Sequence, residues 1–265
     1  MAGDILSIDV DKCTGCGKCA SVCIRGGIAV KDGRATETHG SCFRCWHCAA
    51  VCLAGAIGIA SAPDFEGEPV PKEPPVDYGT MMSFLKQRRS IRLFTGEKVT
   101  GEEFGRLFEA GRYSPTGMNA QGTEFTVIDR ELGRFMQAVY ESLKPLENEF
   151  PRIREFCRYH ENPDSQNGRH PLLWEGKQIV IAFSGSPVDA AIAMTRIELT
   201  AYTMGLGGFY SLFLMKALER DPEKFSEIFS EMEHGKKPAC AFVIGHPRIA
   251  YRRTVPPRDL KVSLL

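Results

Sequence analysis

The sequence predicts a chain of two domains, in which a small cysteine-rich module precedes a larger domain built from both helices and strands. Eight of the ten cysteines lie between positions 13 and 52, and a stretch rich in proline follows over 63–76. Beyond it, apolar residues recur at helix and strand spacings. A chain of 265 residues is long enough for two such domains. We place the module at 1–62, a semi-rigid linker at 63–76 and the larger domain at 77–265.

The cysteines occur in two runs with the same spacing, C-x2-C-x2-C-x3-C. The first run comprises Cys13, Cys16, Cys19 and Cys23, and the second comprises Cys42, Cys45, Cys48 and Cys52. Three thiolates this close wrap one corner of an iron–sulfur cube, and the fourth ligand comes from elsewhere. Because there are two runs, each supplies the fourth ligand of the other. We therefore assign two [4Fe–4S] clusters, held by Cys13, Cys16, Cys19 and Cys52 and by Cys42, Cys45, Cys48 and Cys23.

Two other uses of cysteine fit less well. A structural zinc site takes C-x2-C pairs separated by a longer loop, whereas four cysteines crowd into each run here. Disulfides need an oxidising compartment, and Met1-Ala-Gly-Asp4 does not resemble the start of a secretory signal peptide. The small module cannot build a large core, so we expect its folding to depend on the clusters.

The cysteine runs resemble those of the bacterial two-cluster ferredoxins. Strand-like segments at 26–30 and 54–59 follow the two runs in matching positions, which marks an internal repeat. Alternation over 6–10 predicts a further strand that pairs near the end of the module. One departure from the family is that Ile24 and Leu53 stand where a proline usually follows the fourth cysteine.

The balance of charged residues gives no reason to expect nucleic acid or an acidic membrane as a partner. Lys+Arg and Asp+Glu are balanced at 33 each, so composition offers no argument for binding nucleic acid or an acidic membrane. No uncharged apolar stretch is long enough to span a bilayer. Reduced thiolates and oxygen-sensitive clusters favour a cytoplasmic, oxygen-poor setting.

Periodicity predicts the elements of the larger domain. Thr80 is the expected N-cap of a helix through Arg88, and Thr100 with Glu103 forms a capping box for the next helix. A polar loop over 114–121 precedes a strand. Further helices are expected at 132–143, 153–160, 189–205 and 211–220, and strands at 123–128, 178–184 and 239–245. We expect substrate-shaping residues in the long, irregular segment 145–174.

Clustered arginines predict an anion site. Arg88, Arg89 and Arg92 lie within five residues, with Ser90 between them, and a second basic pair, Arg252 and Arg253, lies near the C-terminus. Arginine supplies planar donors that suit a phosphate. The alternative for each pair is solvated surface charge. The loop 114–121, which offers a hydroxyl and two amides, suits the polar edge of a planar heterocycle.

Four motifs in this order resemble the nitroreductase superfamily of FMN proteins. They are Arg88-Arg89-Ser90-Ile91-Arg92, Ser114-Pro115-Thr116-x-x-Asn119-x-Gln121, Gly205-Leu206-Gly207-Gly208, and Gly245-His246-Pro247 followed by Arg252-Arg253. With the front module, the whole chain resembles the ferredoxin–nitroreductase fusion proteins of anaerobic bacteria. The resemblance implies an α+β fold: a 2[4Fe–4S] ferredoxin-like module joined to an FMN-binding nitroreductase-like domain that forms a homodimer, with FMN at the subunit interface.

The resemblance also implies roles for these residues. Arg88, Arg89, Ser90 and Arg92 would hold the flavin phosphate and pyrimidine edge, with Arg92 near N1 and O2, where positive charge stabilises reduced flavin. Pro115, Thr116, Asn119 and Gln121 would belong to the flavin site, the first three reaching it from the partner subunit. Arg252 or Arg253 would complete the phosphate site. Leu206, Gly207 and Gly208 would also belong to the flavin site. A Gly207-Gly208 turn would let the backbone approach the ring, the alternative being a helix terminus.

The predicted function is an oxidoreductase that passes electrons from the clusters to FMN and on to a small organic acceptor, such as a nitro compound, a quinone or an activated alkene. A cluster moves single electrons and a flavin can store two. Joining them therefore converts single-electron delivery into two-electron reduction of the acceptor. A low-potential donor such as a ferredoxin would supply the electrons, and no catalytic acid or base stands out. The alternative is an electron-transfer protein that serves a protein partner. Cys157 and Cys240 are expected to be small core residues, and the surface is expected for His39, His160, His170 and His234.

Overall fold

The computed structural model describes residues 5–38, 42–62, 65, 67–162, 169–229 and 235–265. The chain divides into two compact units. The smaller comprises Met1–Pro75 with Gly117–Ala120, and the larger comprises Val76–Thr116 with Gln121–Leu265. His39 and His234 lie outside the described residues, as do parts of the proposed linker and of segment 145–174.

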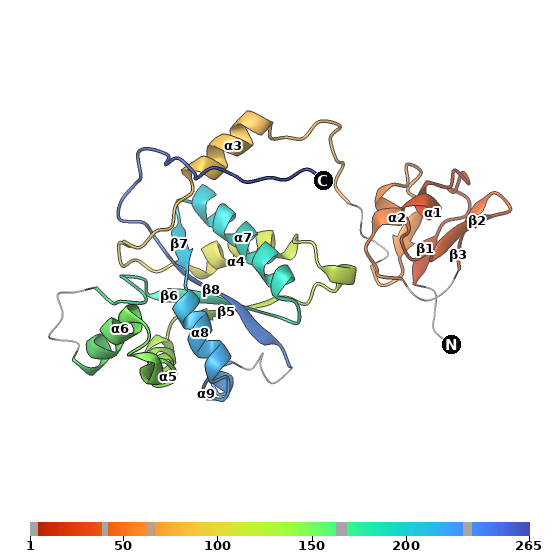
Figure 1. Ribbon diagram of the computed structural model, residues 1–265. Helices are drawn as coiled ribbons and strands as arrows, with labels where there is room; N and C mark the ends of the chain where they lie inside the picture. The colour runs from red at the N-terminus through yellow and green to blue at the C-terminus, as the bar shows by residue number, and fades with distance from the viewer. Residues whose placement is uncertain (1–4, 39–41, 63–64, 66, 163–168, 230–234) are drawn as a thin grey trace. The chain divides into compact units, whose positions relative to one another are not determined.

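The smaller unit is built from two copies of a strand–helix–strand motif. Its helices are α1 (Lys18–Val22) and α2 (His47–Ala50) (Figure 1). Strand β1 (Leu6–Ile8) pairs antiparallel with β4 (Ile57–Ile59), which confirms that the first strand pairs near the end of the module. Strands β2 (Ile28–Lys31) and β3 (Arg34–Glu37) form a hairpin. The predicted strands after each cysteine run, β2 and β4, are therefore both present.

Strand β3 was not expected from the sequence, because charged and polar residues surround its one buried side chain, Ala35. A local signal for it does exist. Asp32 and Gly33 link β2 to β3 with φ of 49° and 73°, the left-handed pair that a two-residue hairpin needs. Asp-Gly is one of the strongest sequence signals for such a turn.

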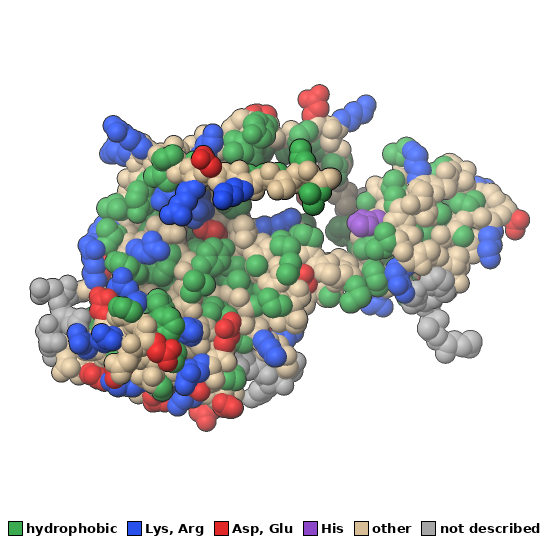
Figure 2. Space-filling view, viewed as in Figure 1, with side chains coloured by type: hydrophobic (Ala, Val, Ile, Leu, Met, Phe, Trp, Pro, Cys, Tyr) green, Lys and Arg blue, Asp and Glu red, His purple; other side chains and the backbone are tan. Residues whose placement is uncertain are grey.

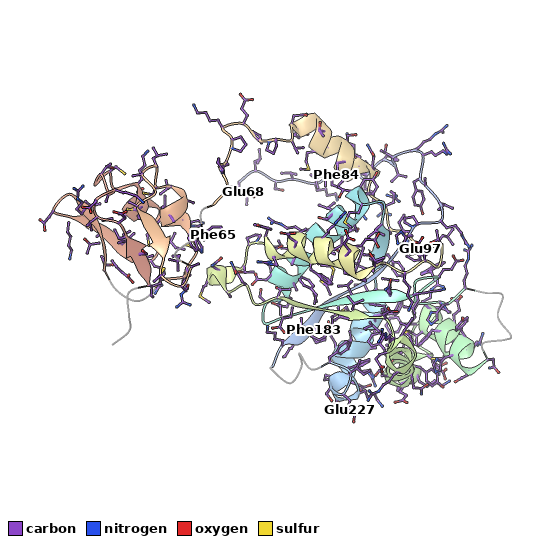
Figure 3. The ribbon with its side chains drawn as sticks, turned by 180° about the vertical axis from the view of Figure 1, so that it is seen from behind. Phe65, Glu68, Phe84, Glu97, Phe183 and Glu227 are labelled. Carbon is purple, nitrogen blue, oxygen red and sulfur yellow. The ribbon has the colours of Figure 1, made fainter. Side chains whose placement is uncertain are left out.

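The larger unit contains a four-stranded antiparallel sheet in the order β5-β6-β8-β7 (Figure 1). Its strands are β5 (Glu124–Ile128), β6 (Gln178–Ser184), β7 (Gly207–Tyr210) and β8 (Lys237–Gly245). Every residue of β6 is buried, which matches its expected place as an inner strand. The side chain of Phe183 lies in this central sheet (Figure 3).

Helices cover both faces of the sheet, and alternation along β6 divides the core in two. Ile179, Ile181 and Phe183 pack into one cluster with α5 (Leu132–Leu143), α6 (Pro151–Glu161), α8 (Leu212–Arg220) and α9 (Glu223–Ser226). Val180 and Ala182 pack into the other with α4 (Gly101–Arg112) and α7 (Pro187–Thr203). The α+β fold is therefore a sheet between two helical layers, as Figure 1 shows.

Capping residues fix where two of the helices begin. Helix α3 (Tyr78–Gln87) is capped by Asp77, whose carboxylate accepts from the Thr80 amide at 3.0 Å, so the prediction of Thr80 as N-cap was wrong. The capping box of α4 is confirmed, since Thr100 and Glu103 each accept from the other's backbone amide. Two short 3-10 turns, Gly117–Asn119 and Lys144–Leu146, complete the helical elements named.

Gly207 and Gly208 belong to β7, so the expected turn and the alternative helix terminus were both wrong as local structure at these two residues. The approach of their backbone to a flavin ring stays a prediction. Strand β7 pairs with the end of β8, where Gly208 lies opposite Ile244. A Cβ on Gly208 would lie 2.0 Å from the Val243 carbonyl oxygen, and one on Gly207 would lie 2.5 Å from the Ile91 side chain. These glycines therefore permit close packing of backbone segments.

Charged side chains are distributed without a dominant sign. Figure 2 shows basic and acidic residues interspersed over the larger unit, in keeping with a net charge of zero. Most of the ion pairs are exposed and contribute little to stability. Of the helices that the structure describes, none has the length and apolar character needed to cross a membrane.

Candidate functional site

Four cysteines surround a cavity of about 380 Å³ in the smaller unit. They are Cys13, Cys16, Cys19 and Cys52, the set assigned above to one cluster. The first three come from the loop before α1 and from α1 itself, and Cys52 follows α2. Apolar side chains such as Val30 and Ile57 complete the wall. Soft thiolates at the corners of an apolar cavity form a donor set suited to an iron–sulfur cluster.

The other four cysteines of the two runs line a second, tighter cavity of about 20 Å³. They are Cys23, Cys42, Cys45 and Cys48, again the set that the sequence groups together. The Trp46 ring forms part of this wall and packs edge-on against Phe65 at 4.9 Å between centroids. Among the described residues, no three His, Cys, Asp or Glu side chains converge on a point that could hold one metal ion.

Backbone amides donate to several of these sulfurs at equivalent positions of the repeat. The Gly27 amide lies 3.2 Å from Cys23 Sγ, and the Ala56 amide lies 3.3 Å from Cys52 Sγ. The Ala35 amide donates to Cys13 and lowers the pKa of that thiol. Burial instead raises the pKa of Cys19 and of Cys48. Donated hydrogen bonds favour the thiolate, which is the form that binds metal.

The loops that carry the cysteines adopt the same left-handed backbone in both runs. Gly15 and Arg44 occupy equivalent positions with φ of 68° and 51°. Gly17 and Trp46, which precede α1 and α2, have φ of 78° and 64°. The first run uses glycine at both places, whereas the second run holds two side chains in a conformation that is normally costly.

A cavity of about 430 Å³ in the larger unit gathers arginines beside the backbone of β7. Three arginines line it: Arg88, Arg89 and Arg248. Leu206, Gly207 and Gly208 of the predicted glycine motif form another part of its wall, together with Tyr202 and Tyr251. The structure therefore brings together residues of three of the four motifs that the sequence predicts: the first arginines, the glycine motif and Pro247 of the Gly245-His246-Pro247 motif.

Two of these arginines are already paired. Arg88 Nη1 lies 2.9 Å from Glu198 Oε1, whose side chain is 11% exposed, and Arg248 Nη2 lies 2.9 Å from Glu175 Oε1. Among the residues that the structure describes, Arg89 has no ion-pair partner. A donor set of three guanidinium groups, one of them without a carboxylate, suits a phosphate. The cavity thus fits the phosphate-bearing part of a flavin mononucleotide.

Arg248 is a cavity residue that the sequence analysis missed, while Arg252 and Arg253 do not line the cavity and are exposed. Arg252 and Arg253 stand out in the sequence because they are two adjacent charges. The signal that could have identified Arg248 is its position directly after the Gly245-His246-Pro247 motif. Pro247 also lines the cavity, and backbone bonds tie this segment to residues 93–95.

Arg92 and Ser90 do not line the arginine cavity. Arg92 instead lines a neighbouring cavity of about 260 Å³, where its guanidinium lies over the rings of Trp174 and Phe209. The two cavities share no lining residue, but the segments 88–92 and 205–213 each contribute to both. The Ile91 amide donates to the Gly208 carbonyl at 2.9 Å and joins these segments between the cavities.

None of the loop residues Pro115, Thr116, Asn119 and Gln121 lines the arginine cavity. Thr116 Oγ1 accepts from the Gln121 amide at 3.0 Å, which closes the loop on itself. Gly117–Ala120 groups with the smaller unit, where the Asn119 amide donates to the carbonyls of Phe43 and Arg44. Their role in a flavin site of a partner subunit stays a prediction.

Two histidines expected on the surface are half-buried. His160 stacks on Tyr140 at 4.3 Å between centroids, and burial lowers the pKa of His160. His170 lies between Phe156 and Tyr159, and burial lowers its pKa to about 4. Cys157 is fully buried, as expected of a core residue, and Cys240 is partly buried.

Comparisons with known proteins agree with this division of the chain. Residues 85–246 match the profile described as "Nitroreductase family", and residues 6–28 match that of the 4Fe-4S binding domain. An FMN reductase (NAD(P)H) of Bacillus subtilis strain 168 is 27% identical over 165 residues, which cover 62% of this chain. The alignment spans 64% of that relative's length.

Solved structures show the same fold. A nitroreductase with bound FMN from Desulfitobacterium hafniense DCB-2 superposes with a TM-score of 0.53 and 19% identity, over 69% of this chain and 97% of that one. A nitroreductase with bound FMN from Bacteroides fragilis NCTC 9343 gives 0.51 and 17%, over 69% and 98%. The family match covers well over half of the sequence. The chain therefore belongs to the nitroreductase family and carries a 4Fe-4S ferredoxin domain at its N-terminal end.

Proposed function

We propose that this protein is an FMN-dependent oxidoreductase that receives electrons through two [4Fe–4S] clusters and reduces a small organic acceptor. The observation that carries the proposal is the joining, in one chain of the nitroreductase family, of two four-cysteine sets and an arginine-lined cavity. When bound, FMN supplies a two-electron carrier that matches single-electron donors to organic acceptors.

The arginine cavity would hold the cofactor. Arg89 and Arg248 would bind its phosphate, and Arg88, which is fixed by Glu198, would add charge and orient the site. Arg92 would provide positive charge beside the pyrimidine edge from the neighbouring cavity. Pro115, Thr116 and Asn119 would complete the site from the partner subunit of a homodimer, as the family resemblance implies.

Two clusters are proposed because the cavity walls repeat the same donor set. The matched family profile covers only the first cysteine run, so the second cluster rests on Cys42, Cys45, Cys48 and Cys23 lining one cavity. Ile24 and Leu53, which follow the last cysteine of each run, are 79% and 89% exposed and border the two cavities. Exposed apolar side chains beside each cluster offer contacts to a protein electron donor such as a ferredoxin.

Those exposed side chains also favour a second candidate function, delivery of electrons to a protein partner. The two functions differ in whether a small molecule reoxidises the reduced protein. The experiment reduces the protein without oxygen, using a low-potential donor, and follows flavin and cluster absorbance after addition of a nitroaromatic, a quinone or an enone. Fast, saturable reoxidation supports the reductase. Slow, unsaturable reoxidation by all three supports the electron carrier, and absence of bound FMN contradicts both.

A further inference from the structure

The second cysteine run of the smaller unit is contacted by a distant segment of the same chain. This segment, Gly117–Ala120, groups with the smaller unit. Asn119 Nδ2 lies 3.2 Å from the Phe43 carbonyl oxygen and 3.1 Å from that of Arg44. Phe43 and Arg44 are the two residues between Cys42 and Cys45. A single side chain therefore donates to two consecutive carbonyls of the cysteine loop.

The peptides that Asn119 holds also shape the proposed cluster site. The Arg44 amide donates to Cys42 Sγ at 3.3 Å, so the same residue accepts from Asn119 and donates to a ligand sulfur. Phe43 and Cys42 both line the cavity assigned to the second cluster. Hydrogen bonds to a loop that carries ligands orient those ligands and tune the metal site. Asn119 therefore acts on the second cluster site through its ligand loop.

The first cysteine run is held in a different way. Its loop packs against the hairpin of the same module, where a Cβ on Gly15 would lie 2.2 Å from the Gly33 carbonyl oxygen. Arg34, which follows that turn, donates to the Cys13 carbonyl. The first loop is thus fixed by residues of the ferredoxin domain, whereas the Arg44 carbonyl of the second loop accepts from a residue 75 positions further along the chain.

Strained backbone gathers in the two segments that Asn119 joins. Of the seven non-glycine residues with positive φ that the structure describes, four lie in them: Arg44, Trp46, Met118 and Asn119. The φ of Asn119 is 56° and that of Arg44 is 51°. Asparagine tolerates this backbone better than most residues. Such strain persists only where the surroundings impose it, and it concentrates at functional sites.

We propose that Asn119 is a positioning residue that makes the second cluster the one from which electrons leave the ferredoxin domain for the flavin. The inference rests on the proposed function, in which Pro115, Thr116 and Asn119 complete the flavin site of the partner subunit. A loop that serves the flavin and also holds the second cysteine run links the two sites. Each transfer carries one electron drawn from the low-potential donor. Two transfers, with two protons from solvent, complete the reduction of the acceptor.

The test follows a single turnover of the holoprotein without oxygen, after rapid mixing with reduced ferredoxin. Cluster absorbance reports the arrival of electrons, and flavin absorbance reports their departure from the clusters. Asn119→Asp keeps the shape of the side chain and tolerates the same backbone, but its carboxylate cannot donate to the two carbonyls. It is expected to slow flavin reduction at least about tenfold and to leave cluster reduction within about twofold of the parent.

Two further variants separate the hydrogen bonds from other effects at this position. Asn119→Gly lacks the donor and adopts a left-handed backbone without strain, so flavin reduction is expected to slow as it does in Asn119→Asp. Met118→Ala is the matched control, because Met118 has φ of 54° and is 71% exposed. It is expected to behave as the parent. Loss of FMN from both Asn119 variants would assign the residue to the flavin alone, and loss of half the iron would assign it to cluster retention; either would overturn the inference.

Amide hydrogen exchange of the oxidised holoprotein gives a readout that does not depend on electron flow. In Asn119→Asp the segment 42–46 is expected to exchange at least about tenfold faster than in the parent, because its loop loses two hydrogen bonds. The equivalent segment 13–17 is expected to keep the parent's rate. Unchanged exchange of 42–46, or unchanged flavin reduction, would overturn the inference. If the parent reduces no small acceptor although its flavin is reduced, the proposed function fails, while the same two measurements still decide the role of Asn119.

Discussion

Gly15 and Arg44 show how one backbone conformation constrains two copies of a motif differently. Both lie between the first two cysteines of their runs, and both have a left-handed backbone. A Cβ on Gly15 would lie 2.2 Å from the Gly33 carbonyl oxygen, which belongs to the β2–β3 turn. Arg44 is exposed and carries a full side chain at the equivalent place. The two runs are therefore equivalent in ligands but not in the space around them.

We predict that Gly15→Ala disrupts the first cluster site, because a methyl group cannot overlap backbone atoms without moving the hairpin. Iron content per chain is expected to fall by about half, from about eight to about four atoms, since one of two clusters is lost. The measurement is iron and acid-labile sulfide in anaerobically purified protein. Gly17→Ala is the control: it has the same sign of φ but open space around its Cβ. It is expected to keep its iron and to lose only about 1 kcal/mol of stability to strain.

His170 gives the larger unit a defined response to acid. Burial lowers its pKa from 6.5 to about 4, so the unfolded chain binds this proton more tightly than the folded chain. The stability contributed by neutral His170 is therefore present above pH 6.5 and is lost as the pH falls toward 4. His160, whose ring lies near the same aromatic residues, opposes charging of His170.

We predict that His170→Asn flattens the acid dependence of unfolding, because asparagine can accept the same turn amides without titrating. Between pH 6.5 and about 4, the parent is expected to lose about 2 kcal/mol more than the variant. Urea unfolding of the larger unit, followed through flavin absorbance, measures the difference. Cluster decay in acid affects both proteins alike. If the unfolding free energies of parent and variant depend on pH in the same way, the acid response does not come from His170.

Strand β7 is the element on which the arginine cavity depends. Its two glycines allow the 88–92 segment on one side and β8 on the other to approach it closely. A Cβ atom added to Gly208 would lie 2.0 Å from the Val243 carbonyl oxygen. Any side chain there must separate β7 from β8.

We predict that Gly208→Ala destabilises the larger unit by more than about 2 kcal/mol and weakens FMN binding, since overpacking forces backbone shifts. Gly205→Ala is the matched control. Gly205 lines the same cavity with φ of 74°, but nothing lies within 4 Å of its Cβ position. It is expected to cost only about 1 kcal/mol. Urea midpoints and retained flavin after dialysis test both; equal behaviour of the two variants would refute the packing argument.

We predict that Thr100→Ala lowers the free energy of unfolding of the larger unit by about 1 kcal/mol, because it removes one half of the capping box of α4. Thr100→Ser retains the hydroxyl and is expected to remain within a few tenths of the parent. Urea denaturation measures both. A loss in the serine variant as large as that in the alanine variant would show that the methyl group, and not the cap, matters.

Local signals predicted most of the elements. Helices α4 and α5 follow from a capping box and from helical periodicity, and strand β6 follows from its continuous apolar run, all of which depend on neighbouring residues alone. Strand β7 was missed because its short, glycine-rich sequence is a strand only through its pairing with β8. Strand β3 was missed although the Asp32-Gly33 turn signals its hairpin. The cysteine groups were predictable because ligand spacing is itself the signal. Arg248 was not, since its entry into the cavity depends on how the chain folds after β8.

The chain joins a unit with little hydrophobic core of its own to a unit with an extensive hydrophobic core. The buried apolar side chains of the smaller unit are few, and three of its cysteines are among the buried residues. The larger unit has two core clusters on opposite faces of its sheet. We therefore expect removal of iron to unfold the smaller unit while the larger unit keeps its fold.

We predict that chelation of iron under anaerobic conditions abolishes the β1–β4 and β2–β3 pairings and leaves β5, β6, β7 and β8 protected. The physical reason is that cluster binding contributes most of the folding free energy of the small unit. Amide hydrogen exchange of the two units, measured before and after chelation, tests this. Equal protection of the smaller unit in both states would contradict it.

Anaerobic turnover driven by reduced ferredoxin, in the parent and in a variant with Cys19→Ser and Cys48→Ser, tests whether electrons enter through the clusters. These substitutions remove one ligand from each four-cysteine set. We predict that ferredoxin-driven reduction of a nitroaromatic falls at least about tenfold in the variant, while bound FMN remains and a chemical reductant still drives the reaction. Unchanged ferredoxin-driven turnover in the variant would contradict the claim that electrons enter through the clusters.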